Sequence, residues 1–303
     1  MVPFVGARAA EMLTQVVAAV AAAAASVALA APSSSLLPEL ESCASRRVAY
    51  VHVNKAGGVS VSAALAKCPA LAARMLDGTV DDHKDIHHHS VQEYLNMSMA
   101  TDGTSAVQAR AAWKDGVFSF AVVRNPYERM VSLFYFKVSK CLSKPSSDHC
   151  EGAQLPTLDE LHAMPEGWQQ DPNVTIGMFG DWIDRLDRLY PVGSARNDLF
   201  SAGCLSFSRK SDASQAAWLE DFDGGLAVTT VIGLPSLSTV FGPLVAQCMP
   251  ECGSLKLGHE NAIWHPPAAD HYTRGHEANA RLIERQAARD FAELGFTIGV
   301  YSG

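Results

Sequence analysis

Short apolar runs that lead into helical patterns recur along the chain. Residues 46–53 (RRVAYVHV) and 117–123 (VFSFAVV) are apolar and rich in valine and aromatic residues, which predicts two buried β-strands. Each run is followed by a helix-like segment, residues 59–68 and 124–138 respectively. Strands that each lead into a helix indicate an α/β fold, with a central parallel sheet flanked by helices.

Two later segments have the periodicity of amphipathic helices. Residues 174–189 and 276–294 place apolar side chains at helical spacing. Residues 139–170 and 193–216 are rich in Ser, Gly, Asp and Pro and are predicted to be loops. With no repeat and no clear linker, a single domain over residues 33–303 is the simplest organisation. The side chains predicted to face the core are Ile176, Phe179, Trp182, Ile183, Leu186, Leu189, Leu282, Ile283 and Phe291.

The first part of the chain has a different character. Residues 12–31 carry no charge and run through an alanine-rich stretch to Ala28-Leu29-Ala30. A cleavable secretory signal has this pattern, and about twenty residues also suffice for a signal anchor that crosses a bilayer once. We therefore expect residues 1–32 to be a signal peptide or a signal anchor. A transit peptide and an ordinary alanine-rich helix are the remaining alternatives.

Charge and cysteine content narrow the function classes. The formal charge of -8 gives no reason to expect nucleic-acid binding, so any anion site must come from a local group of hydrogen-bond donors or positive charges. Seven cysteines suit the oxidising secretory lumen. The close pairs Cys141/Cys150 and Cys248/Cys252 could each close a short disulfide loop. Zinc binding by Cys248 and Cys252 with His259 and His265 is less favoured, because the histidine spacing is too long.

A lysine and two glycines stand where the first predicted strand becomes a helix. A helix N-terminus offers unpaired amides to an anion, and Gly57 and Gly58 would let that anion approach the backbone. Lys55 adds a charge and Ser60 a hydroxyl. The usual nucleotide loop, GxxxxGK[ST], does not occur in the chain. The alternative is a plain strand–turn–helix with an exposed lysine.

A second turn of this kind follows the second strand. Asn125 is the predicted N-cap, Pro126 the first helical residue and Glu128 the partner in a capping box. This places Arg124 at the strand end, where its planar fork could hold a phosphate, and Ser132 could reach another oxygen. The alternative for Arg124 is an ion pair that packs the helix.

The two turns, in this order, resemble the signature of sulfotransferases that use 3'-phosphoadenosine 5'-phosphosulfate (PAPS). The segment HVNKAGGVS resembles the 5'-phosphosulfate loop H-[IV]-P-K-T-[AG]-G-T-S, and VVRNPYERMVS is similar to the 3'-phosphate motif RNPYERLVS. The two segments most resemble those of Golgi-type carbohydrate sulfotransferases, including the heparan and chondroitin enzymes. Weaker similarity extends from about Val48 to Phe296, and RNPYER is its most specific part.

The resemblance implies a P-loop-like nucleotide-binding sulfotransferase fold and a single catalytic domain over residues 33–303. It implies transfer of a sulfuryl group from PAPS to a hydroxyl of a glycan in the Golgi lumen, without a metal. The nucleotide product would be 3'-phosphoadenosine 5'-phosphate. The protein would contact a membrane only through an uncleaved N-terminal segment. The implied cofactor-binding residues are Lys55, Ala56, Gly57, Gly58, Val59, Ser60, Arg124 and Ser132.

Sulfuryl transfer also needs a general base for the acceptor hydroxyl and a cation for the leaving oxygen. Lys55 is the predicted cation. Residues 81–95 (DDHKDIHHHSVQEYL) offer His87, His88 and His89 as bases. Related enzymes carry a K-H-x-[ST]-A-x-E string, and aligning Glu93 with its glutamate favours His88. A solvated loop or a metal site is the alternative for this tract.

The chain departs from the family pattern at a few positions. Asn54 replaces a proline, Ala56 and Val59 replace threonines, and Ser236 replaces a later glutamate. Losing the hydroxyl at position 59 removes one expected oxygen contact. These departures leave open a catalytically weak or dead sulfotransferase-like binding protein. A P-loop small-molecule kinase is a further alternative, against which the missing GxxxxGK[ST] loop argues.

Overall fold

The computed structural model describes residues 43–76, 89–144, 155–189, 214–258, 263 and 265–301. The chain divides into two units, Met1–Glu39 and Leu40–Gly303, and every described residue belongs to the second. The predicted signal or anchor at residues 1–32 lies outside the described residues and stays a prediction. In the described part, no helix has the length and apolar character needed to cross a membrane.

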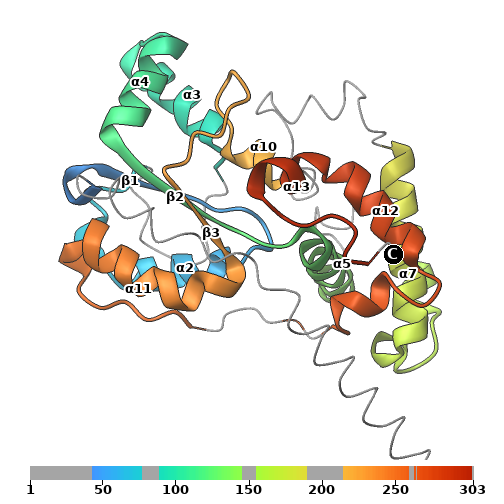
Figure 1. Cartoon of the computed structure of the whole chain (residues 1–303). Helices are drawn as coiled ribbons and strands as arrows, with labels where there is room; N and C mark the ends of the chain where they lie inside the picture. Colours follow the sequence, from blue (N-terminus) through green and yellow to red (C-terminus); the bar gives the residue numbers. More distant parts are fainter. Residues whose placement is uncertain are drawn as a thin grey trace, which may run out of the picture. The chain divides into compact units, whose positions relative to one another are not determined.

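The centre of the fold is a parallel three-stranded sheet in the order β1-β2-β3 (Figure 1). The strands are β1 (Arg47–Val51), β2 (Val117–Val123) and β3 (Thr230–Gly233). β2 is buried along its whole length, as expected for a central parallel strand covered on both faces. The sequence prediction for β2 is confirmed, β1 is shorter than predicted, and β3 was not predicted.

Helices cover both faces of the sheet, which confirms the predicted α/β fold class (Figure 1). Val48 and Tyr50 of β1 share one apolar cluster with α2 and α11, whereas Ala49 and Val51 face a second cluster that includes α4, α5 and α7. This alternation is the two-residue period of a strand. The helices are α2 (Gly58–Leu65), α3 (Val91–Asp102), α4 (Ala106–Gly116), α5 (Pro126–Ser143), α6 (Leu158–His162), α7 (Pro172–Leu189), α10 (Gln215–Leu219), α11 (Leu237–Cys248), α12 (Glu277–Gln286) and α13 (Ala288–Leu294).

The predicted helix at residues 174–189 is confirmed as α7. Its inward side chains Ile176, Phe179, Trp182, Ile183 and Leu186 are buried, and the side chain of Leu189 lies outside the described part. The predicted final helix is interrupted at Ala287, which separates α12 from α13. Ile283 and Phe291 are buried as predicted, whereas Leu282 is only partly buried.

The loop predictions are wrong in part. α5 continues to Ser143 and α6 forms within residues 139–170, because Thr157 and Glu160 make a capping box that starts this short helix. α10 begins at Gln215, and most of the second predicted loop, residues 193–213, lies outside the described residues.

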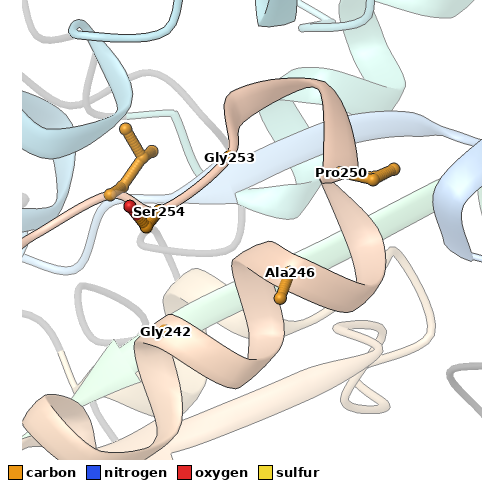
Figure 2. Close-up of a pocket in the computed structure, with 6 residues that line it drawn as sticks. Gly242, Ala246, Pro250, Gly253 and Ser254 are labelled. Carbon is orange, nitrogen blue, oxygen red and sulfur yellow. The ribbon is translucent and has the colours of Figure 1, made fainter.

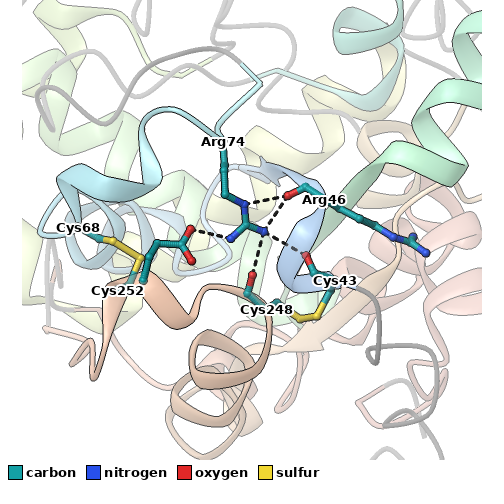
Figure 3. Close-up of polar contacts among 7 residues, drawn as sticks. Cys43, Arg46, Cys68, Arg74, Cys248 and Cys252 are labelled. Atoms are coloured by element: carbon teal, nitrogen blue, oxygen red, sulfur yellow. Dashed lines mark hydrogen bonds and ion pairs between the residues drawn. A yellow bond between two sulfur atoms is a disulfide. The ribbon is translucent and has the colours of Figure 1, made fainter.

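The cysteine pairing differs from the local pairing that the sequence suggested. Cys43 is bonded to Cys248 and Cys68 to Cys252, across 205 and 184 residues of sequence (Figure 3). Cys248 ends α11 and Cys252 ends the following turn, so the two sulfurs face different segments. The predicted Cys248–Cys252 loop is therefore wrong, and neither sulfur is available as a zinc ligand. Cys141 is also disulfide-bonded, and its predicted partner Cys150 lies outside the described residues.

Arg74 reinforces this disulfide corner (Figure 3). Its Nη2 atom donates to the carbonyl oxygens of Arg46, Cys43 and Cys248 at 2.7, 3.1 and 3.1 Å. Its Nη1 atom lies 2.6 Å from a carboxylate oxygen of Glu251. One guanidinium thus connects the start of β1 with the end of α11, at the edge of the sheet opposite the two predicted anion-binding turns.

We expect Arg74→Lys to lower the free energy of unfolding by about 2–3 kcal/mol, because an ammonium cannot satisfy three carbonyls and a carboxylate together. Urea denaturation of the oxidised protein measures the loss. The matched control is Arg188→Lys, whose exposed pair with Asp184 on α7 should contribute less than about 0.5 kcal/mol. Equal effects of the two substitutions would contradict the assignment.

Candidate active site

The turn between β1 and α2 owes its shape to two glycines and a strained lysine. Lys55 has φ of 63° and Gly57 has φ of 89°, both in the left-handed region. Gly57 is the N-cap of α2. A Cβ on Gly58 would lie 1.8 Å from Cδ2 of His52, whose side chain is buried beneath the turn. Gly57 is therefore required by its backbone conformation and Gly58 by the His52 ring, independently of any ligand.

The Lys55 ammonium lies against the helix that carries the second motif. Its Nζ atom is 4.2 Å from the centroid of the Phe136 ring, and Phe136 stands one turn beyond Ser132 on α5. Burial lowers the pKa of Lys55 to about 8, and the nearby charges of Arg124 and Lys140 contribute to this lowering. The structure thus brings the two predicted anion-binding turns together, as parallel strands ending at one edge of a sheet should do.

The start of α5 follows most of the prediction. Pro126 is the first helical residue, and Asn125 is the N-cap, with its side chain accepting from the Tyr127 amide at 3.0 Å. The predicted capping box is wrong, because the Glu128 carboxylate accepts from Nε of Arg124 at 3.3 Å instead. The ion-pair alternative for Arg124 is therefore correct for this one nitrogen. Its terminal nitrogens have no hydrogen-bond partner among the described residues.

One face of α5 gathers the polar groups of the site. Glu128, Ser132, Phe136 and Lys140 recur every fourth residue and are partly or fully exposed, while most of the residues between them are buried. Nζ of Lys140 lies 5.6 Å from the Phe136 centroid, so this ring contacts two ammonium groups. Against the cations Lys55, Arg124 and Lys140, the face presents a single carboxylate. In a chain of net charge -8, this is a local concentration of positive charge.

The other residues predicted for the first turn lie at the beginning of α2. Ala56 is fully buried below the turn, whereas Val59 and Ser60 are the second and third residues of α2 and are partly exposed. The first-turn amides of α2 and the Ser60 position remain suited to an anion. Val59 offers no hydroxyl, as the sequence already indicated.

Two hydrogen-bonding residues that the sequence analysis missed anchor the turns. Gln215 accepts from the Arg124 amide at 2.8 Å and donates to the Arg124 carbonyl at 2.7 Å. Arg129 donates from Nε to the carbonyl of Asn54 at 3.0 Å, directly before Lys55. The position of Arg129 inside the RNPYER motif was a usable signal, but nothing local marks Gln215.

The candidate general bases are only partly described. His87 and His88 lie outside the described residues, so their role stays a prediction. The ring of His89 is 5.3 Å from that of Tyr94 and precedes Ser90, the N-cap of α3. Glu93, which aligned the histidines, accepts from the Ser90 amide at 2.8 Å in a capping box. It therefore sets where α3 begins, immediately after the histidine tract.

An open cavity of about 460 Å³ lies away from these turns (Figure 2). It is bounded by the outer face of α11, at Gly242 and Ala246, and by the segment from Pro250 to Leu255. Its lining carries no charged side chain, so it offers no cation to a phosphate. Within the described ranges, no group of three or more His, Cys, Asp and Glu residues is placed to hold a metal ion.

We expect Gly58→Ala to lower the free energy of unfolding by about 2–3 kcal/mol, because the new methyl group would overlap the buried His52 ring. Gly177→Ala is the matched control, since it lies within α7 with open space around its Cβ. That change should raise stability by about 0.5–1 kcal/mol. Chemical denaturation measures the free energy of unfolding of both variants. An unchanged value for Gly58→Ala would contradict the predicted clash with His52.

Comparison with known proteins agrees with this geometry. The sequence profile of the sulfotransferase family matches residues 42–199, more than half of the chain, and both turns lie inside the match. The comparisons with curated proteins and with solved structures found no match. The parallel sheet flanked by helices is an α/β sulfotransferase fold. The chain therefore belongs to the sulfotransferase family, whose members transfer sulfuryl groups to hydroxyl-bearing acceptors.

Proposed function

We propose that this sulfotransferase takes the sulfuryl group from PAPS and transfers it to a hydroxyl of a carbohydrate acceptor in the secretory pathway. The observation that carries the donor assignment is the meeting of two cationic turns at one edge of the sheet. The first turn brings Lys55 and the second brings Arg124, and both lie by the face of α5 that includes Ser132.

The chemistry of these donors fits PAPS. The nucleotide carries anionic groups at its 5' and 3' ends, and the site has two separate sets of donors. The 5' set is Lys55, Ser60 and the first-turn amides of α2. The 3' set is the Arg124 terminal nitrogens and Ser132. Burial lowers the pKa of Lys55 and the positive charge of Arg124 adds to that lowering, so a bound polyanion would favour the protonated lysine.

When bound, PAPS would supply the sulfuryl group, whose bond to the 5'-phosphate oxygen breaks as the acceptor oxygen bonds to sulfur. Protonated Lys55 would stabilise the charge that develops on the departing oxygen. We assign the acceptor proton to His88, with His87 and His89 as alternatives. The capping box at the start of α3 supports this role by fixing the helix directly after the histidine tract.

Two observations support a secretory location and a glycan acceptor. The disulfides Cys43–Cys248 and Cys68–Cys252 form readily in an oxidising lumen and rarely in the cytosol. The acceptor class comes from the resemblance of the RNPYER segment to Golgi carbohydrate sulfotransferases. In this proposal residues 1–32 deliver the catalytic domain to the Golgi lumen, either as a cleaved signal or as an anchor.

A second candidate is a sulfotransferase-like protein with weak or no catalytic activity. Val59, at the second position of α2, favours it, because no hydroxyl is present where the family pattern has threonine. Such a protein would still bind the nucleotide through Arg124 and Ser132. Nucleotide binding combined with no sulfuryl transfer to any glycan acceptor would select this candidate.

We expect the purified protein to bind 3'-phosphoadenosine 5'-phosphate in calorimetric titration, and Arg124→Ala and Lys55→Ala each to weaken binding at least about tenfold by removing a charged hydrogen bond. Lys67→Ala, an exposed lysine just after α2, is the control and should bind like the parent. No binding by a well-folded parent would refute the donor assignment. Binding of ATP with magnesium in its place would favour the kinase alternative.

We also expect this affinity to fall as the pH rises above about 8, since the free protein then loses the Lys55 proton that the bound anion needs. The phosphate groups are fully ionised over this range, because their last pKa is about 6. Titrations between about pH 7.5 and 9.5 span the pKa of Lys55 and measure the slope. Lys55→Arg should flatten it, because arginine keeps its charge. A slope unchanged by Lys55→Arg would assign the titration to another group.

A further inference from the structure

A buried carboxylate on α13 lies behind the second turn. Asp290 is fully buried, and its Oδ1 atom accepts from the Ala216 amide at 2.9 Å. Its Oδ2 atom accepts from Nε2 of Gln215 at 3.2 Å. These contacts place a negative charge at the N-terminus of α10, where unpaired amides favour an anion. Asp290 is thus hydrogen-bonded to the start of α10, and Gln215, the first residue of that helix, is hydrogen-bonded to the Arg124 backbone.

Gln215 transmits this position to the Arg124 backbone. The same Nε2 atom donates to the Arg124 carbonyl at 2.7 Å, and Oε1 accepts from the Arg124 amide at 2.8 Å. Gln215 is fully buried, so water does not replace these bonds. Arg124 directly follows β2, and its backbone is therefore fixed on both sides of the Cα atom.

The charge of Arg129, which contacts the first turn, also acts on Asp290. Burial raises the pKa of Asp290, while the positive charge of Arg129 and the bonds from Gln215 and Ala216 oppose that rise. Arg129 is almost fully buried and donates to the Asn54 carbonyl at 3.0 Å. Asn54 directly precedes Lys55. Asp290 is therefore linked by hydrogen bonds to the Arg124 backbone, and by charge alone to the residue that contacts the first turn.

Burying charged groups such as Asp290 and Arg129 costs free energy, so a role in positioning other residues is the better explanation for them. Removing a carboxylate and a guanidinium from water carries a large desolvation penalty, and apolar residues of similar size often give equal or greater stability. What the buried charges add is a directional link between segments that are far apart in the chain. Here the hydrogen-bonded link joins α13, through Gln215, to the turn that carries Arg124.

We propose that Asp290 is a positioning residue for the nucleotide: through Gln215 it holds the Arg124 backbone where the guanidinium can reach the 3'-phosphate. This inference rests on the proposed function, because it supposes a ligand that is anionic at both ends. Asp290 and Gln215 both lie outside the part of the chain that matches the family profile, residues 42–199.

The test compares two buried substitutions with one matched control. Asp290→Asn removes the charge opposite Arg129 and turns one acceptor into a donor. Gln215→Met keeps the side-chain length but removes the bonds of Gln215 to both Arg124 and Asp290. Glu293→Gln makes the same chemical change as the first variant on the same helix, in an exposed pair with Arg289 at 2.8 Å. Calorimetric competition measures the affinity for 3'-phosphoadenosine 5'-phosphate and for adenosine 5'-phosphate, which lacks the 3'-phosphate.

Asp290→Asn should weaken 3'-phosphoadenosine 5'-phosphate at least about tenfold and adenosine 5'-phosphate less than about threefold, because the Arg124 turn loses its support. Gln215→Met should weaken 3'-phosphoadenosine 5'-phosphate about tenfold and adenosine 5'-phosphate less than about threefold, because only the Arg124 turn is released. Glu293→Gln should match the parent. The selectivity between the two nucleotides separates positioning from loss of stability, which would weaken both equally.

Parent-like affinity in a folded Asp290→Asn variant would overturn the proposal, as would equal weakening of both nucleotides by Gln215→Met. Thermal unfolding monitors folding, and if Asp290→Asn shows no cooperative transition, Gln215→Met decides alone. Failure of the proposed function is a distinct outcome, because the parent itself would then not bind 3'-phosphoadenosine 5'-phosphate, and the inference would fall with it.

Discussion

The hydrogen bond from Arg129 to the Asn54 carbonyl is the interaction on which the arrangement of the site depends. It ties the beginning of α5, which follows β2, to the turn that follows β1. Among the described residues it joins the two turns together with the strand pairing behind them, the apolar packing of Ala56 and the contact of Lys55 with Phe136. A buried guanidinium suits this task, because it is permanently charged and its donors have fixed directions.

The disulfides and the candidate active site lie at opposite edges of the sheet. The bonds Cys43–Cys248 and Cys68–Cys252, with Arg74 between them, fasten the edge where β1 begins. The opposite edge is left for the turns, whose positive charges repel one another. A fold that concentrates cations at one edge must be held together elsewhere, and covalent links with a partly buried arginine do this without adding charge to the site.

Much of the local structure followed from sequence, since its causes are local. The all-apolar run at residues 117–123 specified β2, and Asn125 with Pro126 specified where α5 begins. The glycine pair marked the first turn. Where two local solutions competed, the sequence did not decide: Glu128 could cap α5 or pair with Arg124, and the structure has the ion pair. Asn125 caps the Tyr127 amide, which leaves the Glu128 carboxylate available to Arg124.

The sequence by itself determined the family, the fold class and the two cationic turns, because each is encoded in a contiguous stretch whose strand, cap and glycine signals act over a few residues. Only the tertiary structure decided which cysteines pair, that α12 and α13 are separate helices, and that Gln215 and Asp290 stand behind Arg124. Arg124 and Gln215 are 91 residues apart in the chain. Such contacts arise from packing between distant segments, and no periodicity or spacing in the sequence records them.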